Sequence, residues 1–414
     1  MKTKAGIWLL YLLIGQGITI SVPVLLVFGL AQVHLMQQLG ETQVAAAYGY
    51  GCGLVGLGMI VLHPLLGRLA DWLPWPKATR RFWLVSGSLI GALALVGFAM
   101  ASQRFWLYSF WLLVNVGYGL TGITFSALLP ERLSATDLQR ASGSLGATVP
   151  VIIMLACLLI LGGMANFPMT WRLTSLSLLQ LVGLGIALLV LDFPKGDAIS
   201  SYKKPTRWPR REPNVDYQQY LWILTGRFFY SLSLSGVSFI TLYYVTRFGL
   251  HHDEILRLNG WLSLGVLLLM GAGWFGNALS IHWQRQKPLL ILGGILMMLC
   301  QLGLAWSTEL HWTIAAILLQ QLAVGLYCAL GLALLNRNLP SSLHLGRDIA
   351  IANATYQAGS ALIHFAAPSL LELGISWYGD DGYHLYFSLL SCFALLYVLC
   401  LLPLRELPHG EQHQ

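Results

Sequence analysis

Charge is scarce in this chain of 414 residues. Asp, Glu, Lys and Arg together make up 10% of it, against 56% hydrophobic residues. Soluble domains carry roughly a quarter charged residues, so a soluble enzyme and a nucleic-acid binder are poor interpretations. Apolar runs close to the roughly 20 residues that cross a bilayer as a helix recur from Ile7 to Pro403. The sequence therefore predicts a protein that crosses the lipid bilayer many times and has no nucleic-acid partner.

Motifs for metals, cofactors and nucleotides are also missing. The six cysteines all lie within apolar runs, without a CxxC pair or a neighbouring His at ligand spacing. No Walker loop is present, so we expect no ATP-driven step. Matches to GxGxxG at Gly51 and Gly117 lie inside apolar runs, and we interpret them as faces where helices pack closely. We predict no cofactor, no metal, no catalytic residue and no enzymatic activity.

The apolar runs divide into twelve predicted helices, which indicate an all-α membrane protein. They cover residues 7–33, 44–66, 83–102, 105–128, 142–163, 170–192, 220–246, 259–281, 288–306, 311–335, 350–372 and 382–403. With both termini in the cytoplasm, twenty of the 24 Lys and Arg residues lie inside, and Arg104, Arg172, Arg247 and Arg257 lie outside. Cytoplasmic loops are enriched in positive charge, so this count predicts a multi-pass protein of the cell membrane with both ends inside.

The chain has two similar halves. Gly67-Arg-Leu-Ala-Asp71 is matched by Gly273-Trp-Phe-Gly-Asn277 at a shift of 206 residues, and Arg81 by Lys287 at the same shift. We predict a six-helix bundle over residues 1–192, a basic cytoplasmic linker over 193–219, a second six-helix bundle over 220–406 and a cytoplasmic tail over 407–414. Parallel repeats of this kind are one plan of secondary transporters, with the solute site between the halves.

The loop after the second predicted helix resembles a known family. Gly67-Arg-Leu-Ala-Asp71, followed by Lys77, Arg80 and Arg81, is similar to the loop motif of the major facilitator superfamily. The stretch from His63 to Trp83 resembles the glycoside, pentoside and hexuronide cation symporters and their sucrose-transporter-like bacterial relatives, with Phe82 where those carry Pro. The resemblance implies two six-helix bundles related by a pseudo-two-fold axis, and transport by alternating access.

By this resemblance we expect a secondary active transporter of a small organic solute, sugar- or glycoside-like, with a cation or a proton as the candidate coupling ion. We also expect a monomer. Proton-coupled transporters commonly use a buried carboxylate, and no Asp or Glu lies in the middle of a predicted helix. This absence and the fifteen Trp residues favour an alternative, drug or metabolite efflux. A non-transporting membrane sensor or immunity protein is a third interpretation.

Few ionisable side chains fall within the predicted helices, where charge is costly. Arg227 either extends its head group to the membrane interface or faces the solute path and binds an anionic or hydroxyl-rich solute. His364 is the proton-coupling candidate, with packing as the alternative, and His63 is expected to be structural.

Uncharged polar and aromatic residues are the further candidates for solute binding, because such groups give orientation within apolar cavities. With Arg227, the candidates are Gln16, Asn115, Tyr118, Tyr230, Tyr243, Tyr244, Gln320, Gln321, Tyr327, Asn353, Tyr356 and Gln357. Hydrogen bonding between helices is the alternative for each one. Asn353, Tyr356 and Gln357 are spaced to share one helical face.

Charged residues of the loops form a predicted cytoplasmic gate, in which opposite charges meet where the ends of the two halves approach. Its members are Gly67, Asp71, Arg80, Arg81, Glu131, Arg140, Arg347 and Asp348. By resemblance, Asp71 is expected to face the start of the eleventh helix.

Overall fold

The computed structural model describes residues 2–72, 76–132, 148–149, 151–164, 166–191, 217–283, 285–338, 345–379 and 381–404, which form helices joined by short turns and contain no strand. The first half of the chain, up to residue 191, contains α1 (Lys2–Leu25), α2 (Ala31–Leu39), α3 (Glu41–Trp72), α4 (Pro76–Met100), α5 (Arg104–Arg132) and α7 (Met169–Leu191). The second half, from residue 217, contains α8 (Tyr217–Gly236), α9 (Ile240–Phe248), α10 (His252–Trp283), α11 (Lys287–Trp306), α12 (Leu310–Arg337), α13 (Leu345–Tyr378) and α14 (Tyr383–Leu401).

Among the residues that the structure describes, three short helical segments depart from α-helical geometry. The π-helical turn η1 (Leu26–Leu30) joins α1 to α2, and a second π-helical turn, η2 (Leu158–Gly163), precedes α7. The 3-10 turn η3 (Val237–Phe239) joins α8 to α9. Two predicted helices are thus interrupted without ending, because the apolar pattern continues through the wider or tighter turn.

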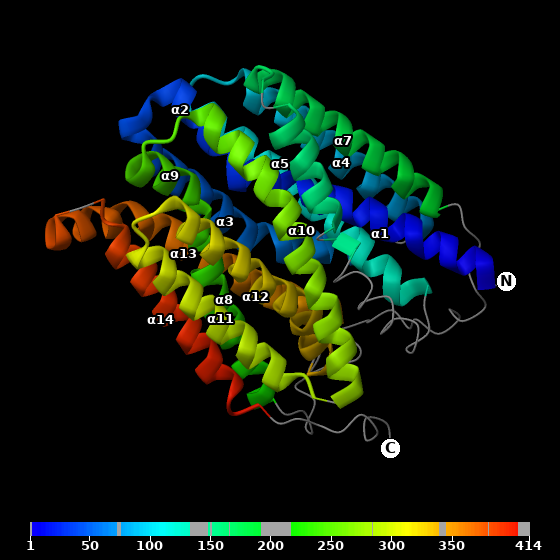
Figure 1. Cartoon of the computed structure of the whole chain (residues 1–414). Helices are drawn as coiled ribbons and strands as arrows, with labels where there is room; N and C mark the ends of the chain where they lie inside the picture. The colour runs from blue at the N-terminus through cyan, green and yellow to red at the C-terminus, as the bar shows by residue number, and fades with distance from the viewer. Residues whose placement is uncertain are drawn as a thin grey trace.

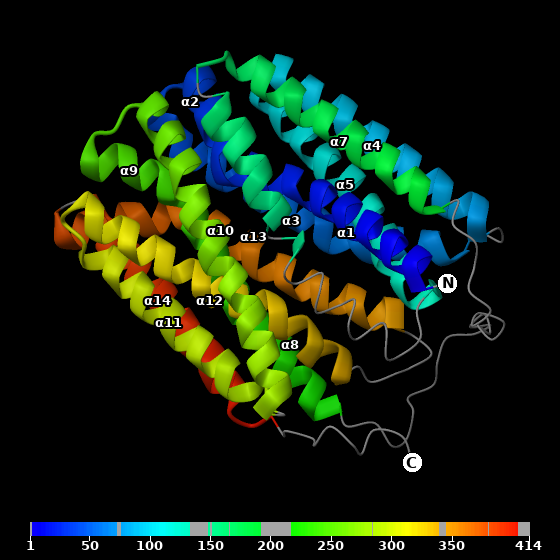
Figure 2. The ribbon, with the colours of Figure 1, turned by 45° about the vertical axis from the view of Figure 1, so that its right-hand side comes forward.

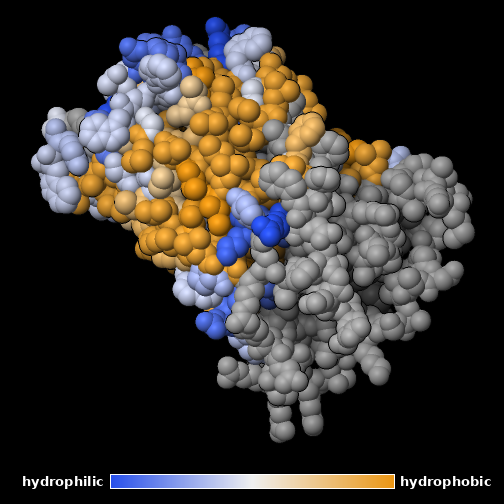
Figure 3. Space-filling view, turned by 60° about the horizontal axis from the view of Figure 1, so that its bottom comes forward, coloured by the Kyte–Doolittle hydropathy of each residue, from blue (hydrophilic) through white to orange (hydrophobic). Residues whose placement is uncertain are grey.

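Each of the twelve predicted ranges overlaps a helix of the structure, and several helices are longer than predicted. The longest, α13, has 34 residues, and α3 and α10 have 32 each. The predicted ranges end at the first polar residues after each apolar run, but the helical backbone hydrogen bonds continue through those residues. Within the described residues, seven helices are long and apolar enough to cross a membrane. Figure 3 shows a broad hydrophobic band with hydrophilic side chains on both sides of it.

The helices pack into two bundles that follow the two halves of the chain. In one, α4 packs on α5 and α7, and α1 packs on α7; in the other, α11 packs on α12 and α14, and α8 packs on α13 and α14. Figure 1 shows the two bundles side by side. The beginning of α1 and the end of α14 lie at the same end of the molecule, which we call the terminal end (Figure 2).

The bundles meet toward the other end of the molecule, which we call the opposite end and which contains Gly40 and Gly249. There α3 packs along α13, η2 packs on α10, and η1 contacts η3. On α3, Gly49 and Gly56 approach the other bundle so closely that an added Cβ atom would lie 2.7 Å from the His364 carbonyl oxygen and 2.8 Å from Ala361, respectively. Glycine therefore permits this contact between the bundles, which we call the seam.

Gly260 of α10 forms a second part of the seam with Gly162 of η2. An added Cβ atom on Gly260 would lie 2.5 Å from the Cα atom of Gly162. Close by, the Gln32 side-chain amide donates a hydrogen bond to the Ser238 carbonyl, from one bundle to the other. These two residues are 206 positions apart, the shift of the predicted repeat. Equivalent positions that touch lie at the axis relating the repeats, which supports that prediction.

An ion pair ties the second bundle together at the opposite end. The Arg247 Nε atom of α9 lies 2.9 Å from a carboxylate oxygen of Asp381, and the two side chains are only 13% and 14% exposed. Arg247 also donates to the Ala305 carbonyl at 3.2 Å. We expect Asp381→Asn to lower the melting temperature of the detergent-purified protein, because a largely buried cation then loses its anion. The expected cost is about 1–2 kcal/mol, between the values for exposed pairs and for fully buried pairs. The exposed Glu254→Gln serves as the control; an equal effect of the two variants contradicts the prediction.

Candidate functional site

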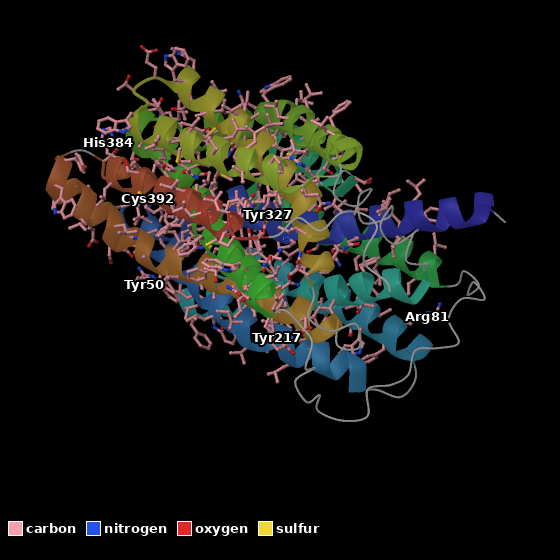
Figure 4. All side chains as sticks on the ribbon, turned by 90° about the horizontal axis from the view of Figure 1, so that it is seen from below. Tyr50, Arg81, Tyr217, Tyr327, His384 and Cys392 are labelled. Carbon is pink, nitrogen blue, oxygen red and sulfur yellow. The ribbon has the colours of Figure 1, made fainter. Side chains whose placement is uncertain are left out.

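Arg227 lies deep along the helix that carries it. It is ten residues after the start of α8, which corresponds to about 15 Å along the axis. Tyr327 is ten residues before the end of α12, and Tyr356 is eleven residues after the start of α13, so the three positions lie at similar depth. Figure 4 shows Tyr327 between Arg81 at the terminal end and His384 at the opposite end. The helices thus bring these residues to the middle layer of the molecule.

The Arg227 guanidinium has weak partners within the described part of the chain. Its Nη2 atom lies 3.5 Å from the Asn353 side-chain oxygen, and its Cζ atom lies 6.0 Å from the centre of the Tyr356 ring. Its Nε atom is buried and makes no hydrogen bond. Arg227 itself is half-buried, and Asn353 is exposed. The residue is therefore only partly exposed, and its guanidinium retains donor capacity.

Tyrosine rings form a wall beside this guanidinium. Tyr230 of α8 stacks on Tyr327 of α12 with ring centres 3.5 Å apart and planes 16° from parallel. Tyr397 of α14 lies edge-on to Tyr230 at 5.2 Å. The hydroxyl groups of Tyr230 and Tyr327 are buried and have no hydrogen-bond partner. The residues Arg227, Tyr230, Tyr327, Asn353 and Tyr356 are named the Arg227 cluster below.

The structure thus brings together five of the residues predicted to bind solute, all from the second half. Gln321 and Gln357 are half-buried on the same helices, α12 and α13. Gln320 faces another way, because its side-chain amide contacts the Met297 sulfur of α11 at 3.2 Å. Tyr243 is fully buried near the opposite end, and its hydroxyl donates to the Leu304 carbonyl at 3.1 Å. Neighbouring Tyr244 is fully buried too.

The candidates of the first half are not part of this cluster. Asn115 donates to the Trp111 carbonyl of its own helix at 3.0 Å. Tyr118 is buried, and its ring would meet an added Cβ atom on Gly91 of α4 at 3.2 Å, which places it between helices of one bundle. Gln16 of α1 is buried, with its side-chain oxygen unpartnered. A solute role for these three stays a prediction.

His364 lies at the seam and has hydrogen-bond partners on both ring nitrogens. Its Nδ1 atom donates to the Ser360 carbonyl at 2.6 Å, and Ser238 then donates its hydroxyl to Nε2 at 2.8 Å. The ring is 3% exposed and lies edge-on to Tyr48 of the other bundle at 6.0 Å between ring centres. This arrangement suits a neutral imidazole, and proton coupling stays a prediction.

The gate is only partly within the described residues. Gly67, Asp71, Arg80, Glu131 and Arg347 lie on described helices but their side chains fall outside the described part, and Arg140 lies outside it altogether. Arg81 is exposed at the terminal end (Figure 4). Asp348 is buried, and its carbonyl accepts a hydrogen bond from the Tyr220 hydroxyl at 2.6 Å. The predicted linker and tail lie outside the described residues, except that 217–219 begin α8.

Sequence reasoning missed Tyr397, Gln32 and Ser238. Tyr397 lies in an apolar run whose pattern is the same as that of core aromatic residues, and no signal distinguished it. Gln32 and Ser238 could have been found, because the predicted shift of 206 pairs them directly.

Comparison with known proteins agrees with this arrangement. The family model described as Major Facilitator Superfamily matches residues 7–362. No curated protein matches the chain.

Solved structures of transporters resemble the chain over nearly its whole length. One is the human organic anion transporter MFSD10 (TETRAN), with a TM-score of 0.67, 14% identity, and coverage of 95% of this chain and 98% of that one. A second is an auto-inhibited peptide transporter of the POT family, with a TM-score of 0.74, 12% identity, and coverage of 98% of this chain and 99% of that one. A third is a D-xylose-proton symporter, with a TM-score of 0.67, 15% identity, and coverage of 95% of this chain and 96% of that one. Because the family model covers most of the chain, the protein belongs to the major facilitator superfamily and is a multi-pass membrane transporter, not an enzyme.

Proposed function

We propose that the protein is a secondary active transporter of the cell membrane that moves a small organic solute by alternating access, with both termini cytoplasmic. The observation that carries this proposal is the Arg227 cluster, which contains a half-buried cation with spare donors about 15 Å along α8 from its start. Solute sites of transporters with parallel repeats lie near the midplane. If the terminal end lies in the cytoplasm, the seam closes the bundles on the extracellular side of the membrane. The Arg227 cluster is then open toward the cytoplasm.

A sugar- or glycoside-like solute is the first candidate, and the glycoside, pentoside and hexuronide subgroup follows from the resemblance of the His63–Trp83 stretch. Amide, phenol and guanidinium groups with an aromatic wall suit a solute that has hydroxyl groups and apolar faces. A cation or a proton is the proposed coupling ion, and the monomer is the proposed unit of transport. Efflux of a drug or metabolite is the second candidate, which the tyrosine wall also supports.

Transport by the purified chain in proteoliposomes tests the function. We expect uptake or efflux of at least one solute from a panel of labelled sugars, sugar acids, glycosides and lipophilic cations, with and without a pH gradient. Arg227→Ala should reduce the rate at least tenfold, since that factor corresponds to about 1.4 kcal/mol, within the range of one charge-assisted hydrogen bond.

Arg104→Ala is the matched control, because Arg104 is exposed at the opposite end and bonds only Gln43 of its own half among the described contacts. Equal loss in both variants argues against the Arg227 cluster as the solute site. If a folded, inserted protein moves no solute under any gradient, the interpretation as a non-transporting sensor or immunity protein is favoured.

A further inference from the structure

We propose that the solute of this transporter is an organic anion and that Arg227 binds its acidic group. This inference rests on the proposed function and narrows its substrate class. It concerns the charge that the solute carries, which neither the fold nor the family determines.

The first observation is the missing counter-charge. Within the described residues no carboxylate pairs with Arg227, although a buried or membrane-depth cation normally has an anionic partner. Arg247 shows what pairing looks like in this protein, since Asp381 lies 2.9 Å from it. The described acid nearest to the cluster along α13 is Asp348, which is five residues before Asn353 and therefore about 7 Å nearer the terminal end.

The second observation is the shortage of acceptors. The guanidinium has five N–H donors in a planar fork. The Asn353 side-chain oxygen accepts only at 3.5 Å, which is the outer limit of a hydrogen bond. Tyr356 offers a cation–π contact with the face of its ring. The Nε atom has none. A carboxylate can accept from Nε and one terminal nitrogen at the same time, which is the preferred geometry of this pair.

The third observation is the character of the neighbours. The hydroxyl groups of Tyr230 and Tyr327 are buried and have no hydrogen-bond partner, and each can donate to an acceptor. A neutral sugar satisfies these hydroxyls but leaves the positive charge uncompensated. A cationic solute adds a second positive charge next to the first. An anion with a body that packs on tyrosine rings fits both features.

Thermal stability of the full-length protein in detergent tests the inference with matched solutes. Benzoate and benzamide share a ring, gluconate and glucose share a hydroxylated chain, and only the first of each pair is an acid. At equal concentration and ionic strength, we expect benzoate or gluconate to raise the melting temperature and the two neutral partners to leave it unchanged. Comparing phenyl phosphate with benzoate distinguishes a preference for a phosphate group from a preference for a carboxylate. Inorganic phosphate shows whether the acidic group binds without the ring.

Variants of Arg227 identify the residue that binds. Arg227→Gln should abolish the anion-dependent shift, and Arg227→Lys should weaken binding roughly tenfold, because an ammonium group lacks the bidentate fork. Without solute, Arg227→Gln should melt no lower than the wild type, whereas a merely structural arginine would leave a destabilised protein. Arg104→Gln should keep the full shift.

Two results of the melting measurements overturn the inference. One is that no carboxylate or phosphate stabilises the wild type more than it stabilises Arg227→Gln. The other is that a neutral partner stabilises the wild type as much as its acid. Transport of a neutral solute in proteoliposomes would also refute the anionic class of solute. That result would leave the proposed function standing.

Discussion

Gly49→Val is expected to slow transport strongly while leaving each bundle folded. A Cβ atom at Gly49 would lie 2.7 Å from the His364 backbone oxygen and 3.0 Å from the Pro368 ring. A backbone oxygen and a proline ring cannot rotate away, so α3 and α13 must separate at the seam. Overpacking of this kind costs about 1–3 kcal/mol, which lowers the population of the seam-closed state roughly 5- to 150-fold.

Two measurements check this expectation. The rate of solute movement in proteoliposomes should fall by a similar factor, about 5- to 150-fold. Spin labels at Phe105 and Trp312, which are exposed near the opposite end in different bundles, should move apart in a cysteine-free background. Gly122→Val is the matched control, because a Cβ atom at Gly122 of α5 meets nothing within 4 Å. An unchanged distance distribution in Gly49→Val contradicts the role of the seam.

Gly382→Ala should lower stability more than any other single alanine proposed here. Gly382 precedes α14 with φ of 80°, in the region that residues with a Cβ atom rarely adopt. An added Cβ atom would also lie 2.2 Å from the Leu371 carbonyl oxygen of α13. Strain and clash together are expected to cost about 2–5 kcal/mol, because α13 and α14 must separate.

Gly379→Ala isolates the strain from the clash. Gly379 has φ of 69° in the same turn, but an added Cβ atom there meets nothing within 4 Å. Its expected cost is about 1–2 kcal/mol. Melting in detergent and the yield of monodisperse protein should therefore decline clearly more in Gly382→Ala than in Gly379→Ala. Equal losses in the two variants would mean that the contact with Leu371 does not matter.

Sequence reasoning predicted the helices well because hydrophobic runs report burial in lipid directly. It also predicted that the glycines after Gly51 form packing faces, and the structure supplies partners for them: Gly53 faces the Phe365 ring, and Gly56 faces Ala361. The partner helix could not be predicted, because a small residue indicates a close approach without indicating which helix approaches. Gly122 shows the limit, since it belongs to the second motif and meets no neighbour.

The site was predicted in part for a similar reason. Arg227 stood out because it is a charged residue in an apolar run, and the spacing of Asn353 and Tyr356 indicated a shared face. Gln320 and Gln321 are adjacent in sequence, yet the first is fully buried against α11 and the second is half-buried. Which of two neighbouring polar residues faces a solute path depends on the rotation of the helix, and rotation is fixed by packing partners far away in the sequence.

The length of α13 gives the seam a mechanical consequence. From Ala361 at the seam to Leu345 at the helix start there are sixteen residues, which form a stiff rod of about 24 Å. A tilt of about 10° at the seam therefore displaces the far tip of the rod by about 4 Å, although the glycine contacts themselves barely shift. The part of α13 between Leu345 and Ala361 thus acts as a lever arm that pivots at the seam, and a small rotation at Ala361 becomes a much larger displacement at Leu345.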